Sequence, residues 1–303
     1  MRRLIIVILL LASLYSEGQI INASPAYRPQ VASCSYLLDQ YSGAAAAYSL
    51  RKLDCDYTGY AVRVRRSSDN AEQDIGFTAN GDFDTSSLKI FVGSNDGHVT
   101  KWYDQSGNGL NAIQTTSASQ PRIVNSGVVF RKNTKPSIEF YRTGATYLQN
   151  SMSVSGITDF YSVAVYNVNV ISGINTYVIS STSNQVGYQH NGDTYWGYAG
   201  GIHSNTYPNN MTTVILAEIL FDGGGGTNDD RLKSYQNGSF LTSSSFSGTV
   251  PSSVNVLNIV IGALYTGALN LTGSIAEFIL FNSDKSSNRI SIESNINSYY
   301  SIY

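Results

Sequence analysis

A cluster of aromatic and polar side chains between residues 188 and 198 is the group best suited to binding a ligand. An aromatic ring can stack on the apolar face of a sugar, while Asp and His can hydrogen-bond to its hydroxyl groups. If this stretch is a strand, alternate side chains point to opposite faces, so some of the aromatics face the core. The predicted ligand-binding residues are Tyr188, His190, Asp193, Tyr195, Trp196 and Tyr198.

A polar turn follows the apolar segment Val99–Tyr103 and has the sequence Asp-Gln-Ser-Gly-Asn-Gly from Asp104 onward. Asp and Asn side chains bond to their own backbone and Gly accepts positive φ, so this composition predicts one sharply defined corner. Oxygen ligands suit calcium, which makes Asp104 and Asn108 secondary candidates for a calcium site. The turn itself accounts for the same residues, and one carboxylate is few for calcium. We therefore expect no cofactor.

Other catalytic arrangements are not indicated. The sequence has no Gly-x-Ser-x-Gly nucleophile elbow, and the four glycines at 223–226 are followed by neither Lys-Ser/Thr nor a predicted helix. A hairpin loop explains these glycines better than a phosphate site. Glu139, Glu218 and Glu277 lie in predicted strands and could form a carboxylate pair, but the sequence does not place them near one another.

The first 18 residues have the pattern of a signal peptide, in which two Arg precede the apolar run Leu4–Leu14. This run is shorter than the roughly 20 residues that span a bilayer, so we expect cleavage after Gly18 and no membrane insertion afterwards. Residues 19–33 contain two Pro and no periodicity, which indicates a leader or linker before one domain at 34–303. The predicted location is secreted or at the cell surface.

Cys34 and Cys55 are the only cysteines of the chain. In an exported protein a single pair is best interpreted as a disulfide, which closes a short loop and stabilises the fold by about 3 kcal/mol. With only two cysteines, a thiolate zinc site is excluded.

Short segments that alternate apolar and polar residues recur along the chain, separated by Asn-Gly or Gly-rich turns. About a dozen of them predict an all-β sandwich. Asp84 is expected to cap a helical turn, and the segments Tyr48–Arg51 and Tyr60–Arg65 are expected to pair. The spacing of Ile292, Ile296, Tyr299 and Tyr303 predicts a short C-terminal helix.

Three short sequence segments resemble segments of the catalytic domain of α-L-arabinofuranosidase B and come in the same order: Ala47–Leu53, Arg63–Asp69 and Trp102–Gly109. A fourth, Thr194–Gly201, resembles an aromatic, Gly-rich strand of that family. The chain thus resembles glycoside hydrolase family 54, a retaining family with a concanavalin A-like fold, and its corner also resembles laminin-G-like jelly rolls. The resemblance spans about residues 34–281 and implies an all-β, concanavalin A-like jelly-roll sandwich, to which the sequence adds the C-terminal helix.

The resemblance also implies two catalytic carboxylates, which the matching places lack. The family's nucleophilic Glu lies near the Trp-Gly-Tyr segment, where Ser183–Tyr188 has no carboxylate, and its acid/base Asp follows a turn that matches Val260–Tyr265, again without one. The family's vicinal cysteine pair is missing as well. A retaining glycosidase needs two carboxyl groups about 5 to 5.5 Å apart. The resemblance therefore implies the scaffold without its hydrolytic residues.

We therefore expect a secreted carbohydrate-binding or adhesion module without catalysis, whose partner is a glycan or polysaccharide. A net charge of −2 gives no basic footprint for nucleic acid. One alternative is an α-L-arabinofuranosidase-like hydrolase with relocated carboxylates, and another is a structural surface or phage-fibre-like protein. The sequence indicates neither the sugar nor the oligomeric state.

Overall fold

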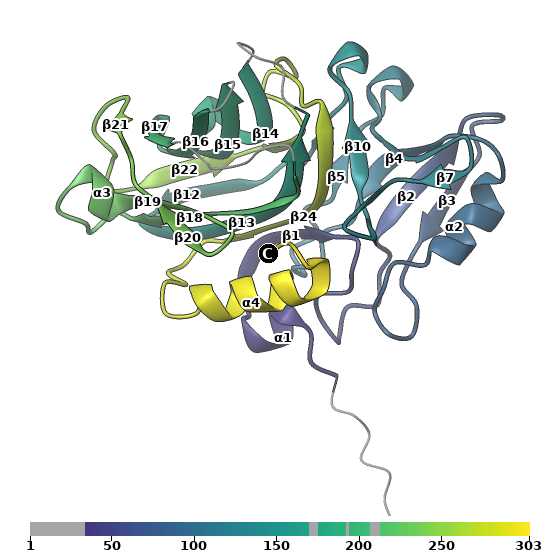
Figure 1. Cartoon of the computed structure of the whole chain (residues 1–303), viewed down its shortest axis with the longest axis horizontal. Coiled ribbons are helices and arrows are strands. Elements are labelled where there is room, and N and C mark those ends of the chain that lie inside the picture. The colour runs from purple at the N-terminus through teal and green to yellow at the C-terminus, as the bar shows by residue number, and fades with distance from the viewer. Residues whose placement is uncertain (1–33, 170–174, 192–193, 207–212) are drawn as a thin grey trace, which may run out of the picture. The chain divides into compact units, whose positions relative to one another are not determined.

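The computed structural model describes residues 34–169, 175–191, 194–206 and 213–303, which form mainly β-strands with a few short helices (Figure 1). The predicted signal peptide and linker lie outside the described residues. The helices are α1 (Leu37–Gln40), α2 (Thr85–Val92), α3 (Asn228–Arg231) and α4 (Arg289–Tyr300), with 3₁₀ turns at Ser117–Ser119, Arg142–Gly144 and Thr182–Asn184. The described helices include none long and apolar enough to cross a membrane.

Strands fill the chain between these helices. Those of the first half are β1 (Ala44–Ser49), β2 (Val62–Arg66), β3 (Glu72–Ile75), β4 (Gly97–Trp102), β5 (Ala112–Ile113), β6 (Arg122–Asn125), β7 (Val128–Val129), β8 (Arg131–Lys132), β9 (Lys135–Pro136), β10 (Ile138–Phe140), β11 (Leu148–Gln149) and β12 (Ser153–Ile157). Those of the second half are β13 (Asp159–Val168), β14 (Asn175–Ser181), β15 (Val186–Asn191), β16 (Thr194–Ala199), β17 (Ile202–Thr206), β18 (Ile215–Asp222), β19 (Leu232–Gln236), β20 (Ser239–Leu241), β21 (Ser245–Phe246), β22 (Val254–Leu257), β23 (Ile259–Ile261) and β24 (Gly273–Phe281).

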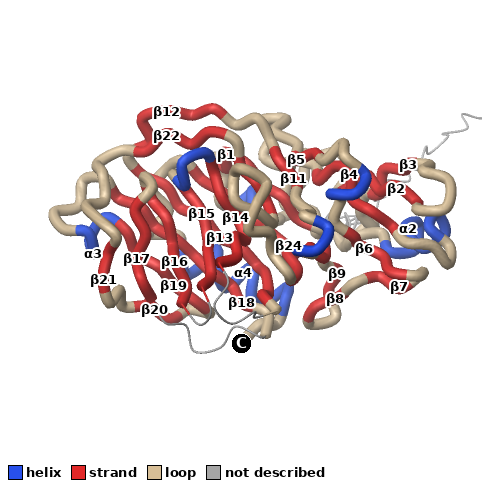
Figure 2. Tube along the Cα trace, turned by 90° about the horizontal axis from the view of Figure 1, so that it is seen from above, coloured by secondary structure: helices blue, strands red, loops and turns tan. Residues whose placement is uncertain are grey.

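Two antiparallel layers make up the sandwich. The first, here called the helix-covered sheet, has the order β19-β18-β13-β24-β1. The second, here called the facing sheet, has the order β5-β11-β23-β14-β15-β16-β17 (Figure 2). A further group of strands, β10, β6, β4, β2 and β3, continues from β24 and joins the facing sheet where β4 pairs with β5. This arrangement confirms the predicted jelly-roll sandwich.

Apolar side chains fill both sides of the helix-covered sheet. The main core lies between the two sheets and includes Trp102, Tyr166 and Phe278, all 1% exposed or less. A second core separates the outer face of the helix-covered sheet from α1 and α4, as Figure 1 also shows, and it includes Ile292 and Ile296 of α4. The C-terminal helix is thus confirmed, but it ends at Tyr300, so the predicted fourth apolar position, Tyr303, lies beyond it.

The predicted pairing of the segments Tyr48–Arg51 and Tyr60–Arg65 is wrong. β1 pairs with β24, whereas β2 pairs with β3 and β4. All residues of β1 are buried, while β2 alternates between buried and half-buried positions. β1 lies at the end of the helix-covered sheet, and its two faces are buried because one contributes to the main core and the other to the second core, while the corner after β4 bonds to it.

The corner after β4 is confirmed. The carboxylate of Asp104 accepts four hydrogen bonds, from the amides of Ala47, Ser106 and Leu110 at 2.9–3.0 Å and from the Ser106 hydroxyl at 2.8 Å. Asn108 Nδ2 donates to the carbonyls of Ala44 and Ala45 at 3.0 and 3.1 Å. Gly107 and Gly109 have φ of +86° and +70°, as the composition predicted. The corner is therefore bonded directly to β1.

The variant Asp104→Asn is expected to lower the free energy of unfolding by about 2 kcal/mol. An amide nitrogen cannot accept the bonds that the second carboxylate oxygen receives, which leaves a donor such as the Leu110 amide without its partner. Urea unfolding measures this difference. The matched control is Asp56→Asn, whose exposed side chain is expected to be replaceable without effect; equal stability of both variants would contradict the role given to Asp104.

Two local predictions are also confirmed. Asp84 caps α2, because its Oδ1 accepts hydrogen bonds from the amides of Ser86 and Ser87 at 3.1 and 3.0 Å. Cys34 and Cys55 form the predicted disulfide, since neither cysteine is free. Such a bond is typical of proteins exported to an oxidising compartment.

Candidate functional site

The predicted aromatic cluster divides between the two faces of β15 and β16. Tyr188, His190 and Tyr195 point into the main core and are 0–2% exposed. The hydroxyl of Tyr188 lies 2.8 Å from that of Ser162, and Nε2 of His190 lies 2.9 Å from the Tyr166 hydroxyl. Stacking on a sugar needs an exposed ring face, which these three predicted residues do not offer. Their position in the structure is that of core side chains.

Burial also fixes the charge of His190. Desolvation lowers the pKa of this imidazole to about 3, so it stays neutral at physiological pH. A neutral histidine inside the core contributes packing and hydrogen bonds. It does not serve as an acid or base for an external ligand.

Tyr198 points to the opposite, outer face of the facing sheet. Its hydroxyl donates to Oε1 of Gln189, its ring stacks on Tyr177 at 6.1 Å between centroids, and the His203 ring lies 5.2 Å away. Asn184 Nδ2 donates to the Tyr177 hydroxyl at 3.4 Å. Tyr198, Tyr177 and Gln189 are 1–6% exposed and form the floor of this face, whereas His203 and Asn184 are half-buried and are the side chains that a ligand reaches. We call these five residues the outer-face cluster.

Two predicted residues cannot be placed in this cluster. Asp193 and the side chain of Trp196 lie outside what the structure describes. The sequence did not predict Tyr177 and Gln189, because only strand register shows that they lie close to Tyr198. Gln189 stands one position beyond Tyr188, so alternation along β15 was the signal that could have placed it on the outer face.

The loop 262–271 forms a wall beside the outer-face cluster. The Tyr177 amide donates to the Leu269 carbonyl at 3.1 Å, and the Ser180 hydroxyl donates to the Ala263 carbonyl at 2.8 Å. This loop contains the place where the resemblance implied an acid/base Asp. The structure therefore brings both of the compared places, Ser183–Tyr188 and Val260–Tyr265, to the same part of the facing sheet.

The described side chains of the outer-face cluster offer neutral hydrogen-bonding groups. Between residues 170 and 214 the sequence contains one acidic residue, Asp193, and between 251 and 272 it contains none. Desolvation lowers the pKa of His203, which favours its uncharged form. Amides, hydroxyls and an uncharged imidazole can bind a polyol. They do not supply the two carboxyl groups that retaining glycoside hydrolysis requires.

The three strand glutamates lie elsewhere and do not line an open groove. Glu139, Glu218 and Glu277 are 0–7% exposed. Burial raises the pKa of Glu139 and of Glu218, the latter to about 8. Glu218 and Glu277 lie on the outer face of the helix-covered sheet, where each pairs with an arginine, Arg289 and Arg51 respectively. These arginine contacts lie beneath α4 and connect the sheet to the segments that cover it.

Asp104 and Asn108, the secondary calcium candidates, already make the hydrogen bonds that hold the corner. Both oxygens of Asp104 accept N–H or O–H donors, and the amide nitrogen of Asn108 faces carbonyls, so an ion would have to displace these bonds. In the part of the chain that the structure describes, the only compact group of metal-ligand types is Cys34, Asp39 and Cys55. Its two cysteines form the disulfide.

The catalytic-domain family of α-L-arabinofuranosidase B matches residues 36–222, more than half of the chain. The protein belongs to this family. An arabinofuranosidase complexed with arabinofuranosyl-α-1,2-xylobiose is 17% identical to it, with a TM-score of 0.57. A variant of a GH54 α-L-arabinofuranosidase soaked with 4-nitrophenyl α-L-arabinofuranoside is also 17% identical, with a TM-score of 0.58. No curated protein matched.

Both comparisons with solved structures cover 86% of this chain and 64% of the other. The chain of this arabinofuranosidase family member thus spans less than two thirds of the solved structures that it matches. At such low identity the likeness shows the shared fold. Together with the family match, it identifies a domain with the fold of the arabinofuranosidase family.

Proposed function

We propose that this protein binds a carbohydrate at the outer face of its facing sheet and does not hydrolyse it. The observation that carries the proposal is that none of the five residues of the outer-face cluster has a carboxylate, while the sequence between 170 and 214 has Asp193 alone. The family match supports the substrate class, because relatives of this fold have been crystallised with arabinofuranosides. Neutral hydrogen-bonding groups suit a neutral sugar.

The expected setting is extracellular, as a secreted or surface-attached module for binding or adhesion to glycans. The disulfide supports this setting, because such bonds persist in oxidising compartments. The sequence pattern of the first 18 residues supports it independently.

A hydrolase is the second candidate, and the family match is the observation that favours it. Its carboxylates would have to come from residues other than those that the resemblance implied. The buried glutamates Glu218 and Glu277 are unsuited, because α4 and their arginine partners cover them. Within the stretch 170–214, Asp193 alone would leave the second carboxyl group missing.

The test uses the full chain with 4-nitrophenyl α-L-arabinofuranoside and with arabinofuranosyl-α-1,2-xylobiose. We expect no release of nitrophenol and a measurable calorimetric affinity for the xylobiose derivative. The variant His203→Ala is expected to weaken this affinity about three- to tenfold, which corresponds to one or two lost hydrogen bonds. Nitrophenol release that a single Asp or Glu substitution abolishes would establish the hydrolase instead.

The matched control is His98→Ala, which removes a half-buried histidine from β4, outside the facing sheet. It is expected to bind like the wild type. If His98→Ala and His203→Ala weaken binding equally, the outer face of the facing sheet is not the binding surface.

A further inference from the structure

A polar cleft opens beside β5 and β11 at one end of the facing sheet. Its volume is about 370 Å³. It contains four amide side chains, two hydroxyl side chains, one tyrosine and one isoleucine, and none of its lining residues is charged. The lining residues are Asn111, Ile113, Gln114, Thr115, Tyr147, Gln149, Asn150 and Ser151. We call it the amide cleft.

Two of the amide side chains, those of Asn150 and Gln114, are held in place by hydrogen bonds and form fixed parts of the cleft wall. Asn150 Oδ1 accepts from the amides of Ile259 and Met152 at 2.8 and 3.1 Å, and its Nδ2 donates to the Tyr48 hydroxyl at 2.6 Å. Gln114 Oε1 accepts from the Thr116 amide at 2.9 Å. Because these bonds hold the walls in place, a ligand does not have to order them when it binds.

Other polar groups of the amide cleft keep their hydrogen-bonding capacity. Asn111 Oδ1 accepts from the Asp104 amide at 3.0 Å, which fixes this side chain while its Nδ2 makes no bond within the described ranges. The side chains of Gln149, Thr115 and Ser151 likewise make no hydrogen bond to any described residue. Uncharged donors and acceptors of this kind match the hydroxyl groups of a neutral sugar.

Apolar surface lies among these groups. Ile113 is 41% exposed, an unusual position for a large aliphatic side chain on a strand, and the ring of Tyr147 lines the same cleft. A sugar ring presents C–H groups on one face and hydroxyls at its rim. A cleft with one aromatic and one aliphatic surface surrounded by amides complements that pattern.

Strand register places the amide cleft on the same face as the outer-face cluster. Gln149 pairs with Val260, which pairs with Ser180 of β14, and alternation puts all three opposite the core residues Leu148, Ile261 and Ile179. Four strand spacings separate β11 from β16, about 19 Å along the sheet. Val260 and Ser180, which lie between these strands, are 0% exposed beside the loop 262–271, so an oligosaccharide that reaches both regions passes over this loop.

The loop 262–271 contacts both regions. Asn270 Nδ2 donates to the Thr146 carbonyl at 3.4 Å and Gly267 lies against the Tyr147 ring, next to the amide cleft. On its other side the Leu269 carbonyl accepts from the Tyr177 amide of the outer-face cluster. The two regions are therefore neighbours across one loop.

We propose that the amide cleft binds a neutral sugar unit of the same glycan that contacts the outer-face cluster, so that the protein recognises an oligosaccharide chain rather than one terminal sugar. This inference rests on the proposed function and extends it to the length of the ligand. The group that decides it is Gln149, which faces the cleft without a partner in the described part of the protein.

Calorimetry with arabinofuranosyl-substituted xylo-oligosaccharides, from the xylobiose derivative to the xylohexaose derivative, tests the inference. We expect wild-type affinity to rise at least about fivefold with length, and Gln149→Ala to remove most of this gain while binding the short ligand as the wild type does. The matched control is Gln73→Ala on β3, an exposed strand glutamine outside the facing sheet, which should retain the full gain.

The outcomes separate the two proposals. Affinity that does not rise with length, or a Gln149→Ala variant that behaves like Gln73→Ala, overturns the second sugar site and leaves the proposed function standing. Absence of binding to every oligosaccharide overturns the proposed function and the second site together.

Discussion

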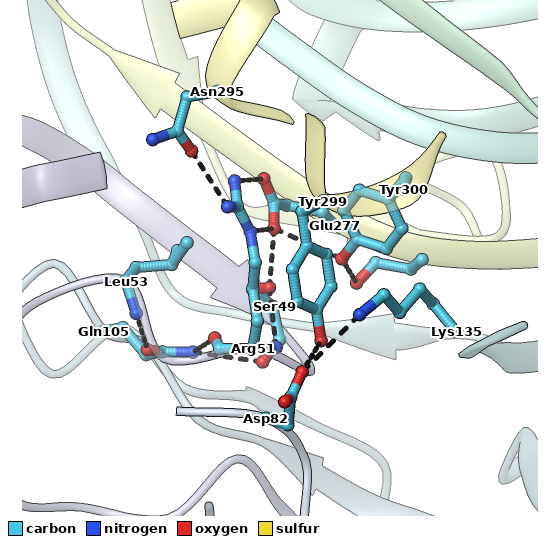
Figure 3. Close-up of polar contacts among 11 residues, drawn as sticks. Ser49, Arg51, Leu53, Asp82, Gln105, Lys135, Glu277, Asn295, Tyr299 and Tyr300 are labelled. Atoms are coloured by element: carbon cyan, nitrogen blue, oxygen red, sulfur yellow. Dashed lines mark hydrogen bonds and ion pairs between the residues drawn. The ribbon is translucent and has the colours of Figure 1, made fainter. Parts of the chain in front are cut away.

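Replacing Glu277 with Ala is expected to lower the free energy of unfolding by about 3–5 kcal/mol, because it leaves the charge of Arg51 buried and unpaired. Glu277 is 0% exposed and accepts from Arg51 Nε and Nη2 at 2.8 and 3.0 Å (Figure 3). Its Oε2 also accepts from the Ser49 hydroxyl at 2.7 Å and the Tyr300 hydroxyl at 3.2 Å. One carboxylate thus joins β1, β24 and α4.

Arg51 extends this network toward α4 and the corner. Its Nη1 donates to Asn295 at 2.8 Å, and its guanidinium lies 5.0 Å from the centre of the Tyr299 ring. Gln105 of the corner donates to the carbonyls of Ser49 and Arg51, both at 3.0 Å (Figure 3). Loss of Glu277 therefore affects contacts between segments that are far apart in the sequence.

Urea unfolding of three variants measures the effect. Glu277→Ala should be strongly destabilised, and the double variant Arg51→Met with Glu277→Leu should recover much of the loss, because an apolar pair leaves no buried charge. Glu72→Ala, at an exposed site on β3, is the matched control and should unfold like the wild type. A loss below about 1 kcal/mol for Glu277→Ala, the size typical of a surface pair, would show that Arg51 finds water or another partner.

Local signals in the sequence predicted the parts of the fold that local chemistry determines. Asp104 and the glycines after it predicted the corner, and Asp84 predicted the start of α2, because both side chains bond to amides within a few residues. The turn glycines and the alternating segments likewise predicted most strands. Each of these signals lies in neighbouring residues of the chain.

The parts of the fold that the sequence did not predict depend on pairing between strands that are far apart in the chain. β1 was placed beside β2, but its partner β24 is more than 200 residues away and shares no local pattern with it. Register also decides which residues accompany Tyr198: alternation separates the core residue Tyr188 from Gln189, but only the pairing of β14 with β15 places Tyr177 beside Gln189. The amide cleft joins residues from two chain segments, 111–115 and 147–151, neither of which forms a motif.

Raising the pH from 5 to 8 is expected to destabilise the protein through Glu218. Burial, and to a lesser degree the charge of Glu293, raises the pKa of Glu218 to about 8, above the usual value of 4.5 that applies in the unfolded chain. The folded protein therefore holds this proton more tightly than the unfolded chain does. The resulting stability is fully present below about pH 4.5 and is lost as the pH rises through about 8, up to about 3 kcal/mol between pH 5 and 8.

Burial is the main cause of the raised pKa, and the contacts around Arg289 show why this arginine does not cancel it. A single nitrogen, Nη1, lies 2.8 Å from Glu218 and 2.5 Å from Glu293, so one guanidinium serves two buried carboxyl groups. Ionising both leaves an excess negative charge beneath α4, where the Tyr161 hydroxyl is a further donor to Glu218. Keeping Glu218 protonated avoids that charge, and this is why the folded state favours lower pH.

Urea unfolding at pH 5, 6, 7 and 8, followed by tryptophan fluorescence, tests this coupling. Glu218→Gln keeps the shape of the side chain but cannot ionise, so its stability should vary less with pH than that of the wild type by up to about 3 kcal/mol over this range. Glu72→Gln should keep the wild-type pH dependence. Parallel curves for Glu218→Gln and the wild type would mean that Glu218 is already ionised at pH 5, and that Arg289 compensates both carboxylates by itself.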